Sequence, residues 1–193
     1  SIVETSFDGC VLYSAETSSS DDVSDQKTTL DYKLTVREIV DFATTVAYQD
    51  IAFILESRTL NMALAQEGMS GNYGLKVGRT ISMLDNKEVF GSEFLCYAMA
   101  LTAAASDARM AGCTLAAMSN SGSGNQGITV TMPIIAYSIH YGTSDEKLAR
   151  ALILSHLIAI HIKGYLGKLS ALCGCVIAST GSSCGLVYLR GGD

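Results

Sequence analysis

The sequence has 193 residues and a formal net charge of −6, with 48% hydrophobic and 17% charged residues. A chain of this length fits one domain with a sizeable core. The acidic balance and the lack of a basic stripe argue against a nucleic-acid partner.

The mean hydropathy of +0.28 makes a membrane protein the first alternative to consider. One uncharged stretch, Ser170 to Leu189, is long enough to cross a bilayer, but polar and small residues occupy all of its faces. Ala149 to Ile162 is too short, and His156 and His161 interrupt it. We therefore predict a buried central helix pair and no membrane partner. The opening residues lack the pattern of a signal peptide, so we expect none.

The cysteines indicate a reducing environment. They are too sparse for a disulfide scaffold and form no Cys-x-x-Cys pair, which leads us to expect a cytoplasmic protein. The six positions are Cys10, Cys96, Cys113, Cys173, Cys175 and Cys184. The chain begins without Met and stops just after an apolar segment, so we expect residues 1–193 to be one domain and a fragment of a longer chain.

The first 33 residues have a β-like pattern. Gly9 to Ser14 is rich in strand-forming residues, Thr17 to Asp25 is a polar loop, and Thr28 to Lys33 alternates weakly. The sequence therefore predicts a small β element at the N-terminus, ahead of a helical region over residues 34–193.

The first helix has a clear start signal. Thr35 followed by Glu38 is a capping box, and apolar residues then recur at helical spacing until they fade before Gly68. Residues 69–89 are predicted to be a glycine-containing loop.

The second clear helix is alanine-rich. Ser92 caps it, it covers Glu93 to Met110, and Gly112 suits its end. A polar loop, Ser119 to Gly127, follows. The remaining predicted elements are a short strand at Ile128–Met132, a helix from Pro133 to about His140, a helix capped by Ser144 that runs to about Ile162 and is broken at Gly164–Gly167, and a last helix over Ser170–Leu189 bent at Gly181. The expected fold class is mainly α, with central buried small-residue helices.

The loop Ser119 to Gly127 contains the pattern G-x-G-x-x-G at Gly122, Gly124 and Gly127. The dinucleotide fingerprint needs a strand before this pattern and a helix after it. Here a helix and loop precede it and a β-like run follows, so we reject that interpretation.

A small-anion site is the better functional interpretation of this loop. Glycines at positive φ let successive N–H groups converge on a carboxylate or phosphate, and serine and asparagine side chains add donors. The alternative is a tight interhelical turn held by serine side chains. The candidate substrate-binding residues are Ser119, Ser121, Gly122, Ser123, Gly124, Asn125, Gln126 and Gly127.

The other polar residues have structural interpretations by default. His140, His156 and His161 are expected to be packed or capped, because the last two are five apart and lack metal-helix spacing. Two cysteines two residues apart on a helix point to opposite sides, so we expect core cysteines rather than a metal site built from cysteines alone. Asp107 and Arg109 are either solvated or tie the loop down.

Three ordered motifs carry a resemblance to a known family. They are Ala104–Gly112, Ser119–Gly127 and Gly167–Gly174. Together they resemble the iron–sulfur L-serine dehydratase α-chain family, most closely its L-cysteine desulfidase branch and related uncharacterised bacterial proteins. The resemblance covers residues 70–193 well and the earlier residues more loosely.

The resemblance implies a lyase that eliminates across the α,β bond of a small amino acid. L-Cysteine would give sulfide, ammonia and pyruvate, and L-serine would give ammonia and pyruvate. The family holds a [4Fe-4S] cluster on three cysteines, and the match assigns Cys173 as one metal ligand. The motif with the other two is absent, so this chain alone is not expected to hold the cluster. The loop Ser119 to Gly127 would hold the substrate carboxylate. The motifs identify no catalytic base, and a homodimer is the expected assembly.

Two alternatives stay open. A non-catalytic relative would keep the loop and bind a small carboxylate without the chemistry. A membrane-transporter fragment would use the polar break between apolar helices as a substrate site.

Overall fold

The structure, a computed structural model, describes residues 4–7, 10–14, 34–83, 91–166 and 173–192. The chain divides into two compact units, Ser1–Lys33 and Leu34–Asp193, and each is described here by itself. The expectation that residues 1–193 form one domain stays a prediction.

The described residues of the first unit are two short strands. Strand β1 (Glu4–Phe7) pairs antiparallel with β2 (Cys10–Ser14), and the register shifts between Thr5 and Ser6. The strand predicted at Thr28–Lys33 and the loop predicted at Thr17–Asp25 lie outside the described residues. A β element over the whole of residues 1–33 therefore stays a prediction.

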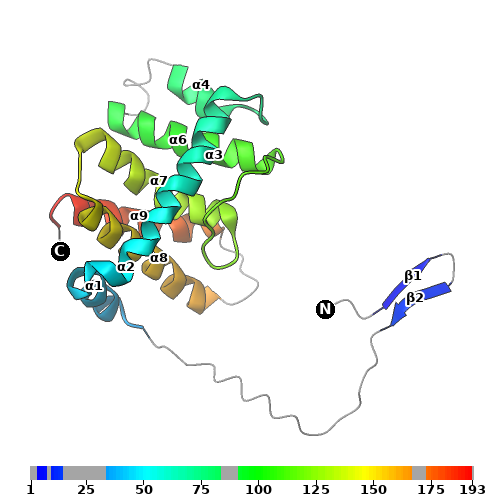
Figure 1. The fold of residues 1–193 in the computed structure, drawn as a ribbon, viewed down its shortest axis with the longest axis horizontal. Helices are drawn as coiled ribbons and strands as arrows, with labels where there is room; N and C mark the ends of the chain where they lie inside the picture. Colours follow the sequence, from blue (N-terminus) through cyan, green and yellow to red (C-terminus); the bar gives the residue numbers. More distant parts are fainter. Residues whose placement is uncertain (1–3, 8–9, 15–33, 84–90, 167–172, 193) are drawn as a thin grey trace, which may run out of the picture. The chain divides into compact units, whose positions relative to one another are not determined.

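The second unit is helical, which confirms the mainly α fold class (Figure 1). Its elements, in chain order, are α1 (Val36–Thr45), α2 (Tyr48–Ile51), the 3-10 turn η1 (Ala52–Leu55), α3 (Glu56–Ser70), α4 (Val77–Met83), α6 (Glu93–Met110), α7 (Gly124–Tyr141), α8 (Asp145–Leu166) and α9 (Gly174–Leu189).

Helices α7 and α8 supply the centre of the core. The fully buried side chains Ile128, Met132 and Ile135 of α7 belong to the same cluster as Leu148 and Leu152 of α8. Helix α9 packs against both α7 and α8, and α6 packs against α3, α4 and α7. Figure 1 shows α3 extending through the unit from α4 to the α1–α2 region. The start of α7 is thus held from several sides.

Helix starts that depend on neighbours in sequence are as predicted. Glu38 Oε2 accepts a 2.8 Å hydrogen bond from the Thr35 N–H, and Thr35 Oγ1 accepts one of 3.3 Å from the Glu38 N–H, so the capping box is complete. Ser92 Oγ accepts from the Leu95 N–H at the start of α6. Ser144 Oγ accepts from the Lys147 N–H ahead of α8. These caps confirm three predicted helix starts.

The strand predicted at Ile128–Met132 is wrong, because these residues form the second turn of α7. The helix also passes through Pro133 instead of beginning there. Ile128, Val130, Thr131 and Met132 are all fully buried. Only a narrow stripe of this helix, which includes Thr129 and Pro133, is partly exposed. With so little polar surface, the 3.6-residue period is weak in the sequence, and the alternation of β-branched residues misled the prediction.

Three further boundaries are corrected. The loop predicted at 69–89 contains α4, whose second residue, Gly78, donates its N–H to Asp107 Oδ2 at 3.0 Å. Helix α8 continues through Gly164 to Leu166. Helix α9 begins at Gly174, and residues 170–172 of the predicted helix lie outside the described residues. The α4 error follows from its cap, which comes from a residue distant in sequence.

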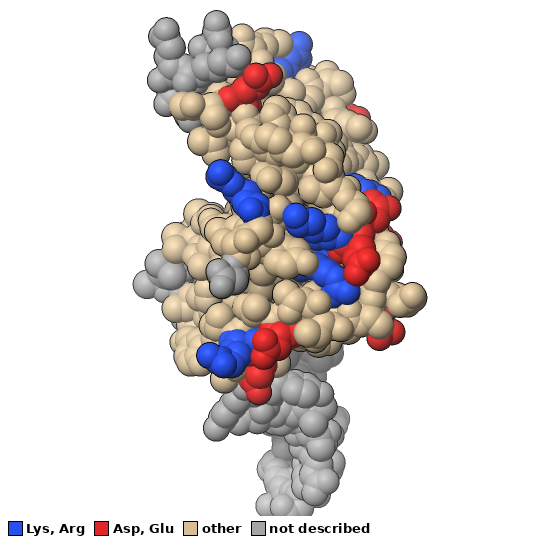
Figure 2. All heavy atoms as spheres, turned by 90° about the vertical axis from the view of Figure 1, so that its left-hand side faces the viewer, with Lys and Arg blue, Asp and Glu red and all other residues tan. Residues whose placement is uncertain are grey.

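Of the described helices, none combines the length and the apolar character needed to cross a membrane. On the face drawn in Figure 2, the described acidic and basic side chains are few, and several lie beside one another. The ion pairs of the described residues include Arg58–Asp145 and Arg150–Glu146, each 2.8 Å long.

Candidate functional site

The polar loop is a tight turn that leads directly into α7. The Ser123 N–H donates to the Asn120 carbonyl at 2.9 Å, and the Asn120 N–H donates to the Ser123 carbonyl at 3.1 Å. Ser121 and Gly122 lie between them at φ values of +49° and +77°. Two successive positive φ values are typical of a two-residue type I′ turn, and glycine adopts this conformation without strain. The turn therefore occupies the N–H groups of Asn120 and Ser123.

The start of α7 presents unpaired N–H groups. Ser123 is the N-cap, and its Oγ accepts from the Gln126 N–H at 3.3 Å. Within the described chain, the N–H groups of Gly122, Gly124 and Asn125 have no hydrogen-bond acceptor. The first turn of a helix also carries the positive end of its dipole. This is an arrangement that favours a bound anion.

Arg109, from the last turn of α6, lies against this helix start. Its Nη1 donates to Asn125 Oδ1 at 3.1 Å, and its guanidinium fills the space where Gly124 would carry a side chain. An open cavity of about 640 Å³ lies here, with Arg109, Ser119, Gly122 and Gly124 among its lining residues. The sequence left Arg109 either solvated or tied to the loop, and the structure shows the tie.

Asp107, two residues earlier, belongs to a different contact. Its carboxylate accepts from the Gly78 N–H at the start of α4. The two neighbouring charged residues therefore hold two different helix starts rather than acting as a pair.

The other side of the turn is fixed by a buried amide. Asn120 Oδ1 accepts from Gln126 Nε2 at 2.7 Å and from Ser121 Oγ at 3.0 Å. Asn120 Nδ2 donates to the His156 carbonyl at 3.2 Å and lies 3.0 Å from His156 Nδ1. Asn120, Gln126 and His156 are all buried. Asn120 thus ties the turn, α7 and α8 together.

The bonding of Asn120 also fixes the state of the His156 ring. A carbonyl oxygen can only accept, so Asn120 Nδ2 faces His156, and His156 Nδ1 must accept as well. Burial lowers the pKa of His156 to about 4, which keeps the ring neutral at pH 7, with its proton on Nε2. In the described part of the chain, this buried Nε2 has no hydrogen-bond partner.

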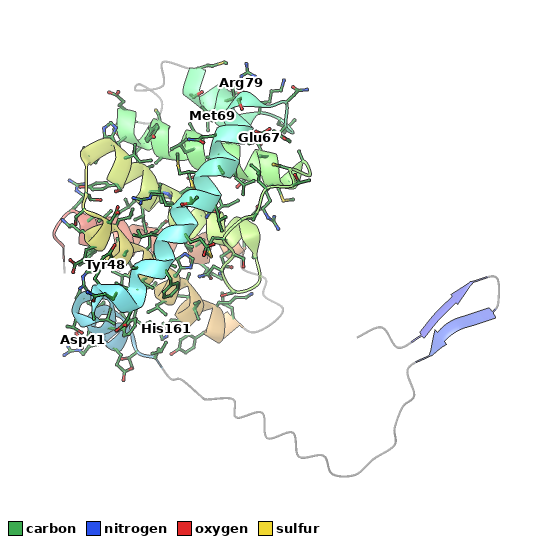
Figure 3. The ribbon with its side chains drawn as sticks, in the orientation of Figure 1. Asp41, Tyr48, Glu67, Met69, Arg79 and His161 are labelled. Atoms are coloured by element: carbon green, nitrogen blue, oxygen red, sulfur yellow. The ribbon has the colours of Figure 1, made fainter. Side chains whose placement is uncertain are left out.

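His161 is unlike His156. Its ring packs edge-on against Tyr165, with centroids 5.1 Å apart. Figure 3 shows it near the Asp41 and Tyr48 end of the helical unit, away from Glu67, Met69 and Arg79. The expectation of a packed histidine is therefore confirmed for His161.

Cys173 is the N-cap of α9 and is exposed. The prediction that Cys173 and Cys175 lie in one helix is wrong, because α9 begins between them, at Gly174. The Cys173 side chain makes no capping hydrogen bond, but the nearby N–H and thiol of Cys175 lower the pKa of the Cys173 thiol. The same contact raises the pKa of Cys175. Cys173 is therefore the better thiolate of the two.

The start of α9 lies beside the start of α7. A Cβ placed on Gly174 would stand 3.2 Å from Gln126 Oε1. The residue before Gly174 is Cys173, so the tertiary structure brings the loop and this thiol into one neighbourhood. Among the described residues, however, no three His, Cys, Asp or Glu side chains gather in a way that could hold a metal ion.

The eight predicted loop residues divide into two groups. Ser119, Gly122 and Gly124 line the cavity, and Asn125 is held beside it by Arg109. The others shape the loop: Ser121 and Gln126 donate to Asn120, Ser123 caps α7, and Gly127 packs against the Met118 carbonyl, which leaves no room for a Cβ. The dinucleotide interpretation fails because α6 and the turn, not a strand, precede the glycines, although a helix does follow.

Asn120, like Arg109, is missing from the candidate substrate-binding residues predicted from sequence. An asparagine before a Ser-Gly pair is a turn signal and could have marked it. Its pairing with His156 has no sequence signal, because the two residues are 36 positions apart.

The comparisons with known proteins identify the family of this chain. The family described as serine dehydratase alpha chain matches residues 13–193. The chain belongs to this family. The family resemblance predicted from the three motifs is thereby confirmed.

Several curated relatives are similar over most of the chain. A UPF0597 protein of Oleidesulfovibrio alaskensis is 55% identical over 161 residues, which are 83% of this chain and 38% of the relative. One from Phocaeicola vulgatus is 52% identical over 83% of this chain and 37% of the relative. One from Shewanella woodyi is 46% identical over 100% of this chain and 45% of the relative. This chain thus spans less than half the length of these relatives. No solved structure matches it.

Proposed function

We propose that this serine dehydratase-like chain is part of an iron–sulfur-dependent lyase that eliminates across the α,β bond of L-cysteine or L-serine. The observation that carries the proposal is the closeness of the two helix starts. Gln126, at the start of α7, lies beside Gly174, which follows Cys173. One start can bind an amino-acid carboxylate, and the other presents the thiol that the family resemblance assigns to the metal.

The carboxylate would bind over the start of α7. Gly122, Gly124 and Asn125 offer N–H groups without acceptors, and the guanidinium of Arg109 lies against the same turn. A carboxylate that takes two or three such donors gains charge-assisted hydrogen bonds and a favourable interaction with the helix dipole. The start of α9 would lie near the bound amino acid, because Gly174 is beside Gln126. Arg109 is an addition to the residues predicted from sequence.

The described residues do not by themselves fit a [4Fe-4S] cluster. Such a cluster needs cysteine thiolates around it. Cys173 is exposed and has a lowered pKa, which suits one ligand, but no group of three candidate ligands forms among the described residues. Any further ligands would come from the part of the relatives' length that this chain does not span. We therefore derive no chemical step through the cluster.

A second candidate function has its own supporting observation. The carboxylate site needs only residues of this chain, whereas the metal site does not close within the described residues. A non-catalytic relative would keep the first and lack the second. It would bind L-serine or L-cysteine and release neither sulfide nor pyruvate.

The test is anaerobic expression of a polypeptide with the length of the relatives that contains this chain. We expect cluster absorbance, sulfide from L-cysteine or pyruvate from L-serine, and loss of absorbance and product in Cys173→Ser. Cys184→Ser is the matched control, because Cys184 lies half-buried in α9, the helix that begins after Cys173, and should be dispensable. Binding without product would favour the non-catalytic relative. Absence of amino-acid binding would overturn both.

A further inference from the structure

The buried ring of His156 poses a question of physical chemistry. Its Nδ1 accepts from Asn120, but its Nε2–H has no acceptor among the described residues. A buried donor without a partner destabilises the fold, and an apolar side chain of similar size would avoid that loss. We therefore look for the contribution of this histidine in the hydrogen bond that Nδ1 accepts.

Nδ1 completes the bonding of one amide group. The Asn120 Nδ2 group has two protons, and His156 accepts both, one at its carbonyl and one at its ring. With both protons held, Asn120 Oδ1 is directed at Ser121 Oγ and Gln126 Nε2. These two residues flank the N–H groups of Gly122, Gly124 and Asn125. The ring thus acts on the loop through Asn120.

We propose that His156 is a positioning residue for the carboxylate site: by fixing the Asn120 amide, it holds the turn in the shape that directs the unpaired N–H groups at the ligand. The assignment of the ligand rests on the proposed function, whereas the effect on the turn does not. His156 touches neither the cavity lining nor Arg109 in any described hydrogen bond.

Two substitutions separate the ring's acceptor from its bulk. His156→Asn puts an amide oxygen near the place of Nδ1, so Asn120 keeps an acceptor, while the new Nδ2 group takes over from Nε2 as the donor without a partner. His156→Leu keeps an apolar side chain and removes the acceptor. Ser155→Ala is the matched control, because Ser155 is the neighbour of His156 on α8 and is also buried. Its Oγ donates to the Val130 carbonyl at 2.8 Å and makes no contact with the turn.

The first measurement uses the 193-residue chain without ligand. In ¹⁵N NMR spectra we expect His156→Leu to shift the amide signals of Gly122, Gly124 and Asn125 and to speed hydrogen exchange at the Ser123 N–H. His156→Asn and Ser155→Ala should leave these signals near their wild-type positions. An unchanged loop in His156→Leu, or equal disturbance in Ser155→Ala, would overturn the positioning role. If His156→Leu does not fold, a disturbed loop in folded His156→Asn would overturn it, and a wild-type loop there would support it.

The second measurement titrates L-serine and L-cysteine into the same variants. We expect His156→Leu to weaken binding roughly tenfold, the effect of leaving one buried amide proton unpaired, and His156→Asn to restore it. If the wild-type chain binds neither amino acid but the loop is still disturbed in His156→Leu, the proposed ligand is wrong and the positioning role is supported. Equal affinity in wild type and His156→Leu would overturn the positioning role alone.

Discussion

The starts of α7 and α9 lie side by side and are built in opposite ways. At α7, Ser123 caps the helix, Asn120 and Gln126 are buried, and Arg109 closes one side. At α9, the N-cap is an exposed cysteine that makes no capping bond. The start of α7 is therefore shaped by contacts within this chain. The start of α9 presents an exposed thiol, which would need further ligands to hold a metal.

The largest expected effect concerns the tight packing of the α7 start. Gly127→Ala should destabilise the fold by about 3 kcal/mol, because the new Cβ would overlap the Met118 carbonyl and the backbone would have to move. Gly164→Ala is the matched control on α8, where a Cβ meets nothing, and it should stabilise by about 0.5–1 kcal/mol. Urea unfolding measures both. Equal effects at the two glycines would show that the α7 start is not tightly packed.

The buried histidine gives the α7 side a pH dependence. Burial lowers the pKa of His156 from 6.5 to about 4, so below pH 6.5 the unfolded chain binds the proton first. Stability from this group is complete above pH 6.5 and should fall by up to about 3 kcal/mol as the pH drops toward 4, at roughly 1.4 kcal/mol per unit.

Urea unfolding between pH 4 and pH 7 measures this slope. His156→Asn should remove the contribution of His156 to the slope of unfolding free energy against pH. His161→Gln should keep this slope, because His161 lies elsewhere on the same helix, with its ring against Tyr165. A wild-type slope that survives in His156→Asn would mean that other groups cause it.

The next effect is on ligand affinity. Arg109→Gln should weaken L-serine binding roughly tenfold, the value of one hydrogen bond to a charged group, with little change in unfolding free energy. Arg58→Gln is the control, because its ion pair with Asp145 is exposed and contributes little. Calorimetric titration compares them. An unchanged affinity in Arg109→Gln would place the carboxylate elsewhere.

The smallest effect compares the two caps directly. Ser123→Ala should cost about 1 kcal/mol, because the Gln126 N–H loses its acceptor. Cys173→Ala should change stability by less than about 0.5 kcal/mol, since an exposed side chain without a capping bond is removed. Thermal unfolding of both variants is sufficient. A larger loss in Cys173→Ala would give the α9 start a structural role.

The accuracy of the sequence predictions followed the range of the interactions behind them. The capping box at Thr35 and the caps at Ser92 and Ser144 involve partners three residues away, and their helices begin where predicted. Helix α4 was missed because its capping partner, Asp107, lies 29 residues away. The second turn of α7 was taken for a strand because all of its residues except Thr129 are buried, which leaves little polar surface to mark a helical period.

The same division applies to the candidate site. The composition of Ser119–Gly127 marked the loop, and the ordered motifs marked the family and Cys173. Which loop residues line the cavity, and which only shape it, depended on side-chain directions that sequence spacing does not give.

The sequence by itself determined the helical class, the local caps, the family and the presence of a polar loop, because each depends on neighbouring residues or on an ordered motif. Only the tertiary structure decided that Arg109 closes the loop, that His156 fixes Asn120, and that Gln126 lies beside the residue after Cys173. The physical reason is that these contacts join helices distant in sequence. Their geometry is set by how α6, α7, α8 and α9 pack around a common core.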